Sequence, residues 1–145
     1  MRGVRDAAAS RLRSAGQRVT AVRSTIVRVL SDATAPLTVP EICDAEPDLA
    51  QSSVYRNLAV LTETGVVHRI EAGIHSRFEL ADDLSQRHHH HLICTECGRV
   101  EDFEPGKDIE TAASRGLAAA ARAKGFRMEA HRLDVVGSCA DCASM

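Results

Sequence analysis

Apolar residues recur at helical spacing in the N-terminal half of the chain, which predicts a series of helices. A first amphipathic segment ends at Gly16, and Thr20 is suited to cap a helix with apolar residues at positions 22, 26, 29 and 30. Thr38 and Glu41 then form a capping box, which predicts a short helix over residues 41–45.

The next helix is predicted after a pair of serines. Ser52 or Ser53 is expected to cap it, and Gly65 is expected to end it. The apolar residues in between repeat at helical spacing and are expected to face the core: Val54, Leu58 and Leu61.

A β-hairpin is predicted directly after this helix. Residues 66–70 and 74–80 have the composition of two strands, and Ala72 and Gly73 mark the turn between them. Three helices followed by a hairpin make a winged helix-turn-helix, in which the recognition helix enters the major groove of DNA.

A change of composition separates the second half of the chain. Residues 81–87 are polar and acidic, without periodicity, and indicate a linker. Beyond them we expect strands at 91–95 and 99–104, an Ala-rich helix over 110–124, and a third strand over 126–136. The predicted fold is α+β, with a winged helix-turn-helix domain at 1–82, a linker at 83–87 and a small α+β domain at 88–145.

Composition narrows the function classes. The 145 residues are 44% hydrophobic and 26% charged, as in a soluble globular protein, and only 3% are aromatic, which excludes a nucleic-acid platform of stacked rings. The net charge is −2, but residues 1–30 hold seven Arg against one Asp, so this end of the chain is a basic patch. An organellar transit peptide has a similar composition, but here the basic stretch continues into a periodic helix without a cleavage-type break.

Four of the five cysteines form two C-x-x-C pairs, Cys94 with Cys97 and Cys139 with Cys142. Because the sequence has no run of about 18 apolar residues and no secretion signal, we expect a cytoplasmic protein with no membrane partner. In that reducing compartment, two such pairs indicate tetrahedral zinc, and a disulfide or redox couple is the alternative. Cys43, in the short helix over 41–45, is expected in the core.

Four consecutive histidines, at 88–91, precede the first cysteine pair. Alternate side chains of an extended segment point to opposite faces, so His89 pairs with His91 and His88 with His90, which gives two candidate metal sites. Further ligands are available on the hairpin and in the second domain: His68, His75, Glu79, Asp102, Glu110 and His131. Of these, we expect His75 to be a solvated surface residue.

The helix predicted after the serine pair carries candidate DNA contacts. Tyr55 and Arg56 lie in its first turn, the part of a recognition helix that meets base edges. An arginine there contacts guanine or phosphate, and a tyrosine ring contacts a thymine methyl group. Including the basic N-terminal region, the candidate DNA-binding residues are Arg18, Ser52, Ser53, Tyr55 and Arg56, and the predicted partner is double-stranded DNA.

These features together resemble the Fur (ferric uptake regulator) family of metal-dependent transcriptional repressors. The matching motifs span nearly the whole chain: Arg18-Val19-Thr20 followed by Arg23, Ser53-Val54-Tyr55-Arg56, Ser76-Arg77-Phe78-Glu79, and the histidine-rich stretch 88–97. The resemblance implies a winged-helix DNA-binding domain and a dimerisation domain. It also implies homodimers that bind a palindromic operator when a sensed metal bridges the two domains.

The resemblance implies three metal sites as well. A structural zinc falls on Cys94, Cys97, Cys139 and Cys142. The regulatory interdomain site falls on Glu79, His89 and His91, completed by His68 or Asp102. An additional site in the dimerisation domain falls on His88, His90, Glu110 and His131.

Departures from the family pattern leave the sensed metal open. Residues 35–38 lack the histidine that many members place there, and His68 resembles a ligand of zinc-sensing members, which usually have Cys where this chain has Glu79. A site of nitrogen and oxygen ligands accepts Fe(II), Zn(II) or Mn(II). A metal-responsive repressor of iron or zinc homeostasis genes is therefore the leading hypothesis.

Two alternatives accompany it. A peroxide-sensing iron or manganese regulator would share the fold, although an aspartate at position 79 would have favoured it more than Glu79 does. A zinc hydrolase with Glu79 as general base is the second alternative, but the sequence has no H-E-x-x-H motif.

Overall fold

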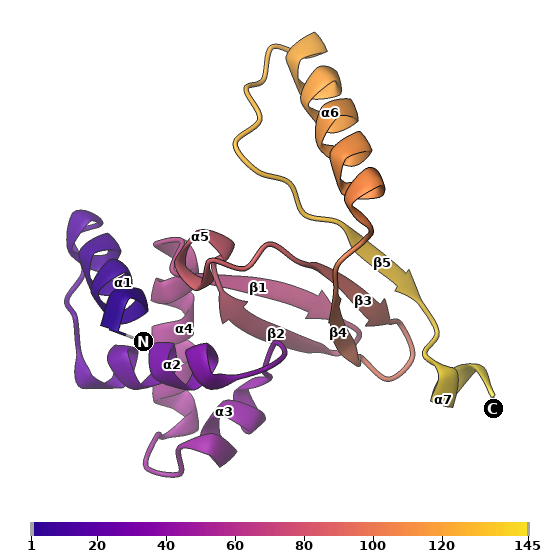
Figure 1. Ribbon diagram of the computed structural model, residues 1–145. Coiled ribbons are helices and arrows are strands. Elements are labelled where there is room, and N and C mark those ends of the chain that lie inside the picture. The colour runs from indigo at the N-terminus through magenta and orange to yellow at the C-terminus, as the bar shows by residue number, and fades with distance from the viewer. Residues whose placement is uncertain (1, 145) are drawn as a thin grey trace.

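The computed structural model describes residues 2–144 and begins with four helices (Figure 1). They are α1 (Arg2–Ser14), α2 (Ala21–Asp32), α3 (Val39–Ala45) and α4 (Gln51–Glu63). Their apolar faces meet in one core that includes Leu12, Ile26, Ile42 and Leu58. Cys43, expected in this core, is half-buried and packs against it. The helical periodicity of the sequence is thus confirmed.

Two helix caps predicted from threonines are confirmed. The hydroxyl of Thr20 accepts the backbone N–H of Arg23 at 3.2 Å and begins α2. Thr38 and Glu41 form a reciprocal capping box at the start of α3, since each side chain accepts the other residue's backbone N–H. Both helices therefore begin where local side-chain hydrogen bonding directs them to begin.

The predicted cap by Ser52 or Ser53 is wrong. Helix α4 begins at Gln51, so both serines lie inside its first turn, and Ala50 at the capping position makes no side-chain hydrogen bond. Ser53 accepts a hydrogen bond from Asn57 of the following turn instead. A serine within the first turn of a helix has the same sequence signature as a serine that caps it.

The predicted hairpin is confirmed as the antiparallel strands β1 (Val67–Ala72) and β2 (His75–Leu80). Gly73, in the turn between them, has a φ of +64°, a conformation that favours glycine. Leu37 and Phe78 exchange backbone hydrogen bonds, which attach β2 to the segment before α3. The hairpin is thereby held against the helices.

Residues 81–87, expected to be an irregular linker, contain the short helix α5 (Asp82–Ser85). Its Leu84 is buried in the N-terminal core, and Asp83 pairs with Arg11 of α1. A single buried leucine in one helical turn produces no periodicity, so the sequence pattern did not reveal this element. The division into domains at 1–82 and 88–145 stays a prediction.

The second half of the chain contains a three-stranded sheet in the order β4-β3-β5. Strand β3 (His90–Cys94) pairs antiparallel with β4 (Val100–Phe103) and parallel with β5 (Asp134–Gly137). The strand predicted over 126–136 is wrong in extent, because residues 126–133 form no regular element and backbone hydrogen bonding to β3 begins at Leu133, whose carbonyl oxygen accepts the N–H of His91. Alternation of side chains alone does not make a strand without a neighbour that accepts its hydrogen bonds.

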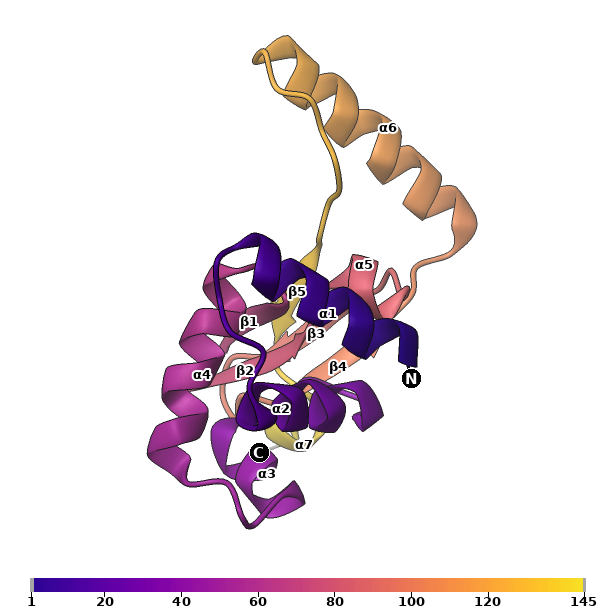
Figure 2. The same ribbon diagram turned by 90° about the vertical axis from the view of Figure 1, so that its left-hand side faces the viewer.

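Helix α6 (Lys107–Ala123) stands away from the rest of the chain in both views (Figures 1 and 2). It begins earlier than predicted and is followed, as expected, by Gly125 in a left-handed conformation. None of its residues is buried. The last element is the one-turn helix α7 (Ala140–Ala143). Among the helices of residues 2–144, none is both long enough and apolar enough to cross a membrane.

The hairpin packs against the three-stranded sheet (Figure 1). Ile70 and Ala72 of β1 form a small buried cluster with Ile93 of β3 and Val100 of β4. This apolar contact is separate from the N-terminal core. It places the side chains of β2 close to those of β3, where the predicted metal ligands lie.

Candidate metal centres

Most of the predicted ligands gather into three four-residue clusters, in each of which candidate ligand atoms lie within 4.8 Å of one another. The thiolate cluster contains Cys94, Cys97, Cys139 and Cys142. The interdomain cluster contains Glu79, His89, His91 and Asp102. The α6 cluster contains His88, His90, Glu110 and His131. His75 is exposed on the hairpin, as expected. The alternation of side chains accounts for the separation of the two histidine pairs, and metal binding by each cluster stays a prediction.

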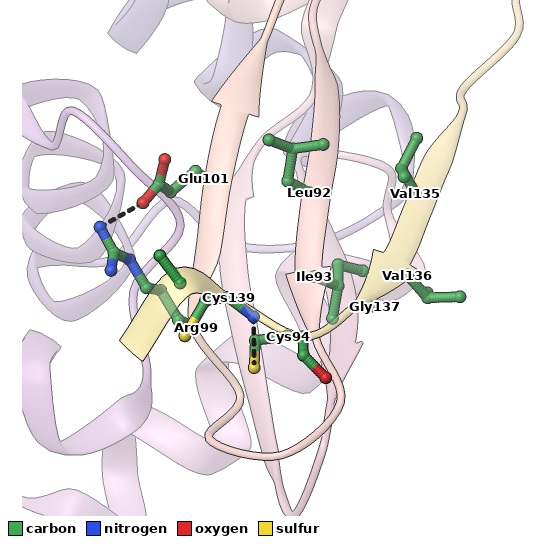
Figure 3. A pocket seen from close by; sticks show the side chains of 11 residues that line it. Leu92, Ile93, Cys94, Arg99, Glu101, Val135, Val136, Gly137 and Cys139 are labelled. Atoms are coloured by element: carbon green, nitrogen blue, oxygen red, sulfur yellow. Dashed lines mark hydrogen bonds and ion pairs between the residues drawn. The ribbon is translucent and has the colours of Figure 1, made fainter. Parts of the chain in front are cut away.

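The end of β3, the turn after it and the start of α7 hold the thiolate cluster, of which Figure 3 shows Cys94 and Cys139. The Sγ atoms of Cys97 and Cys139 lie 3.8 Å apart, and the backbone N–H of Cys139 donates to Sγ of Cys94 at 3.3 Å. Gly98 makes this turn possible, since its φ is +73° and an added Cβ would lie 2.8 Å from the carbonyl oxygen of Ala72. The cysteine turn therefore touches the backbone of the hairpin.

The thiols of this cluster differ in their tendency to ionise. Backbone N–H groups of Cys97 and Cys139 lower the pKa of the Cys94 thiol to about 6. The neighbouring sulfurs of Cys139 and Cys97 raise the pKa of Cys142. A thiolate in this cluster thus opposes the ionisation of the neighbouring thiols. A divalent cation offsets this repulsion because it attracts all four sulfurs. The residues fit Zn(II), which binds four thiolates tetrahedrally.

The interdomain cluster joins β2 of the hairpin to the three-stranded sheet. Glu79 lies on β2, and His91 of β3 is paired in register with Asp102 of β4. Both oxygens of the Glu79 carboxylate face imidazoles: Oε2 lies 3.0 Å from Nε2 of His89, and Oε1 lies 3.0 Å from Nε2 of His91. Glu79 and both histidines are buried. Buried polar groups gathered in this way require partners for their remaining lone pairs and protons.

Two buried atoms of this cluster lack a well-aligned hydrogen bond within residues 2–144: Nε2 of His91, which lies 3.0 Å from Oε1 of Glu79, and Oδ1 of Asp102. The other ring nitrogen of His91, Nδ1, lies 3.1 Å from Oδ1 of Asp134 on β5, which directs Nε2 into the cluster. The two atoms lie on neighbouring strands of one sheet, β3 and β4, and face Glu79 of the hairpin, an arrangement that fits a divalent metal with mixed ligands.

Protons compete with a metal at this cluster. Burial opposes ionisation of Glu79, but the imidazoles of His91 and His89 outweigh it and hold the Glu79 pKa below its usual value. Burial also opposes a charged His91, yet Glu79 and Asp134 raise its pKa. Burial raises the pKa of Asp102. An ion that binds His91 and Asp102 displaces protons, so its affinity is expected to fall as the pH is lowered.

His68, the other proposed fourth ligand, lies outside the interdomain cluster. It groups with Glu79 and Asp82 instead, and its Nδ1 accepts an N–H of Arg132. Burial and the charge of Arg132 lower the His68 pKa, so the ring is held neutral. The structure places Asp102, and not His68, beside the histidine pair; which of the two binds a metal stays a prediction.

The α6 cluster is formed within the second half of the chain, on the opposite face of β3. Nε2 atoms of His88, His90 and His131 each lie 2.8 Å from an oxygen of Glu110. Hydrogen bonding from His90 lowers the Glu110 pKa to about 2. Nε2 of His131 is buried and has no hydrogen bond to the described residues. This cluster therefore also leaves one ligand atom unsatisfied.

The predicted DNA contacts lie on α4 and in the turn before α2. Tyr55 is 54% exposed, and Arg56 and Ser52 are exposed beside it, whereas Ser53 is half-buried. Arg18 is exposed in the turn between α1 and α2. The first turns of α4 thus present an aromatic ring and a guanidinium group to solvent, and their contact with DNA stays a prediction.

Three residues around the clusters were missed by the sequence analysis: Arg77, Arg132 and Asp134. Nε of Arg77 donates to the carbonyl oxygen of Gly98 at 3.0 Å and links the hairpin to the cysteine turn. Asp134 reaches His91 because β5 pairs in parallel with β3. Each contact joins residues far apart in the chain, and no local spacing signals it.

Comparisons with known proteins agree with this arrangement. The sequence profile described as "Ferric uptake regulator family" matches residues 14–136. The peroxide operon regulator of Bacillus subtilis (strain 168) is 34% identical over 139 residues, which cover 91% of this chain and 88% of the relative. The ferric uptake regulator of Vibrio cholerae superposes with a TM-score of 0.68 at 29% identity and covers 90% of this chain and 98% of its own. The Pseudomonas aeruginosa ferric uptake regulator, solved with manganese, has a TM-score of 0.71 at 26% identity, with coverages of 90% and 96%.

Replacing Cys94 with Ser is expected to release one zinc ion per chain and to unfold the second domain. Structural zinc in small units contributes about 10–16 kcal/mol of binding energy that is also folding energy. Zinc content by metal-release assay and helix content by circular dichroism measure the two effects. The matched control is Cys43→Ser, which lies outside the cluster and should keep its zinc. A Cys94→Ser protein that loses zinc but remains fully folded would contradict the structural assignment.

Proposed function

Because the chain belongs to the Ferric uptake regulator family, we propose that it is a metal-responsive, DNA-binding transcriptional repressor. In this proposal the thiolate cluster holds a structural Zn(II), and the interdomain cluster holds a regulatory divalent metal. The α6 cluster is an additional site. The repressed genes serve iron or zinc homeostasis.

One observation carries the proposal: the interdomain cluster takes ligands from both halves of the chain. Glu79 belongs to the hairpin, whereas Asp102 and the histidine pair lie beyond α5. A divalent ion bound there would supply bonds that hold the hairpin to the sheet. Glu79 follows Phe78, whose backbone pairs with Leu37 before α3. A movement of Glu79 would therefore also move the segment that leads into α3.

The residues of the helical half then determine how DNA is bound. Nε of Arg23 on α2 donates to Oδ1 of Asn57 on α4 at 2.9 Å and fixes the two helices relative to each other. Helix α4 presents Tyr55 and Arg56 to the bases. In a homodimer, two copies of α4 would enter successive major grooves of a palindromic operator, about 34–36 Å apart. If the hairpin is released from the sheet, the two copies of α4 no longer keep that spacing. Operator affinity therefore depends on the metal.

A second copy of the chain is the proposed partner of the second domain. Leu92, Val135 and Val136 are exposed apolar residues of β3 and β5, and they line a cavity of about 350 Å³ (Figure 3). Ile109 and Leu117 are exposed on α6, and β5 is an edge strand of its sheet. Apolar surface beside an open strand edge supports association between copies.

The proposed regulatory metal is Fe(II) or Zn(II), with Mn(II) as a further candidate. The interdomain cluster offers only imidazole nitrogen and carboxylate oxygen, and these ligands accept all three ions. The metals available in the cell then decide which one binds. The manganese in the Pseudomonas aeruginosa relative supports the third candidate.

The proposal includes no catalytic step. The cavity beside Glu79, His89 and Asp102 has a volume of about 90 Å³, against the roughly 300–1,000 Å³ of pockets that hold small molecules. A peptide or ester substrate therefore has no room beside these ligands. We place the protein's action in the cytoplasm, on DNA.

Peroxide sensing is a second candidate function. The Bacillus subtilis relative, at 34% identity, is a peroxide operon regulator, and the interdomain cluster contains two buried histidines beside a carboxylate. The same fold and metal site serve both candidates. They differ in what releases the operator: loss of the metal, or oxidation of the protein.

His89→Ala is expected to abolish metal-dependent operator binding while the thiolate zinc and the oligomeric state stay unchanged. Loss of a direct ligand should exceed the roughly 10–100-fold loss of metal affinity that follows removal of an outer partner. The measurement is operator affinity by fluorescence anisotropy, titrated separately with buffered Fe(II), Mn(II) and Zn(II). The matched control is His75→Ala, on the exposed part of the hairpin. Tight operator binding by metal-free His89→Ala protein would contradict the proposal.

Arg56→Ala is expected to relax base discrimination at one position of each half-site by about 1–3 kcal/mol. Arg18→Ala should instead weaken binding to all sequences alike and lower the salt dependence, because a phosphate contact carries no sequence information. Affinities for single-base variants of the operator at several salt concentrations separate the two. Equal losses for both variants on operator and random DNA would show that Arg56 does not read sequence.

Hydrogen peroxide distinguishes the two candidate functions. A regulator that senses only metal should keep its operator affinity equally well in the Fe(II) and Mn(II) forms during a brief, catalase-quenched exposure. A peroxide sensor should lose affinity only in the Fe(II) form, with an added oxygen atom on His89 or His91 in peptide mass spectra. Selective loss with Fe(II) would therefore replace the leading proposal with the second one.

A further inference from the structure

Arg132 places a guanidinium group between the hairpin and the interdomain cluster. It lies in the irregular segment before β5, and its Nη2 donates to Oε1 of Glu79 at 2.9 Å. Its Nη1 donates to Nδ1 of His68, which is also on the hairpin. A cationic side chain of the second half of the chain thus already joins the two parts that share the interdomain cluster.

The oxygen that Arg132 contacts is also the oxygen nearest to the unsatisfied nitrogen of the cluster. Oε1 of Glu79 lies 3.0 Å from Nε2 of His91, and that nitrogen lacks a well-aligned hydrogen bond within residues 2–144. An ion bound to Nε2 of His91 would therefore lie close to Oε1 of Glu79. It would also lie close to the guanidinium group that this oxygen already binds.

The two carboxylates of the cluster each face an arginine, Glu79 with Arg132 at 2.9 Å and Asp102 with Arg87 at 3.6 Å. Asp134 in turn lies 3.1 Å from His91. The Arg87 side chain is 55% exposed and is screened by water, whereas that of Arg132 is 29% exposed. Repulsion of a divalent ion is therefore expected mainly from Arg132.

We propose that Arg132 competes with the regulatory metal for Glu79 and so raises the metal concentration at which the interdomain cluster fills. This inference rests on the proposed function and concerns the threshold of the response. Glu79 already faces both His89 and His91, so it needs no further donor to orient it. Arginine remains protonated at every working pH, so its competition with the metal is constant.

The direction in which the metal affinity changes when Arg132 is removed distinguishes a competing residue from one that supports metal binding. An outer partner that only orients a ligand strengthens metal binding, and its removal weakens affinity roughly 10–100-fold. A competing cation does the opposite, so its removal strengthens binding. Arg132→Gln removes the charge and keeps a polar side chain, and Arg132→Met is a second neutral variant if the first does not fold.

The experiment measures Mn(II) affinity without DNA, on full-length protein that retains its thiolate zinc. Competition with a fluorescent chelator gives the Kd. We expect Arg132→Gln to bind Mn(II) about tenfold more tightly than the unchanged protein, the size of effect for one partly screened charge beside the ion. The matched control is Arg127→Gln, an exposed arginine of the same segment, whose Kd should stay the same.

A charge-preserving variant tests the cause. Arg132→Lys keeps the positive charge but not the planar fork, so its Mn(II) affinity should stay near that of the unchanged protein. An unchanged or weaker Mn(II) affinity in Arg132→Gln would overturn the proposal, and so would equal tightening in Arg132→Lys.

Glu79→Gln distinguishes failure of this inference from failure of the proposed function. If Glu79→Gln binds Mn(II) as well as the unchanged protein does, the interdomain cluster is not the regulatory site, and both proposals fail. If Glu79→Gln loses Mn(II) but Arg132→Gln gains no affinity, the regulatory site stands and only the competition by Arg132 is overturned.

Discussion

Alternation of side chains along β3 and the two residues that precede it is the constraint on which the arrangement of this protein depends. Because successive residues of a strand point to opposite faces, four consecutive histidines are divided between two neighbourhoods. His89 and His91 meet the hairpin through Glu79, and His88 and His90 meet α6 through Glu110. A shift of one residue in this register would exchange the two faces and leave both carboxylates with the wrong partners.

The hairpin is held to the sheet by contacts that need no metal as well as by the proposed ligands. The apolar cluster of Ile70, Ala72, Ile93 and Val100 excludes water between them, and Arg77 connects the cysteine turn to α3 through Glu41. The proposed metal therefore acts on an interface that is already formed. Such an interface suits a switch, because a modest change in binding free energy is enough to shift it between two arrangements.

Local signals in the sequence predicted local structure well. Thr20 and Thr38 make their hydrogen bonds within one helical turn, so their caps could be predicted from spacing alone. The cysteine pairs and the division of the histidines into two pairs could be predicted from spacing, whereas the full sets of candidate metal ligands came from the family resemblance. Contacts across the fold could not: Arg132 and Asp134 reach the cluster only because β5 returns beside β3, and the expected strand over 126–136 pairs with β3 from Asp134 onward. Leu84 was missed for the same reason, since only the assembled core explains its burial.

Gly98 has a consequence for how this sequence can vary. Its left-handed backbone shapes the cysteine turn, and its missing side chain leaves room for the carbonyl of Ala72 in the hairpin. A Cβ atom added at this position would strain the cysteine turn and push on the backbone of the hairpin at the same time. Mutational drift in the cysteine turn is therefore not independent of drift in the hairpin, and the two parts must be exchanged together when chimaeras are built from relatives.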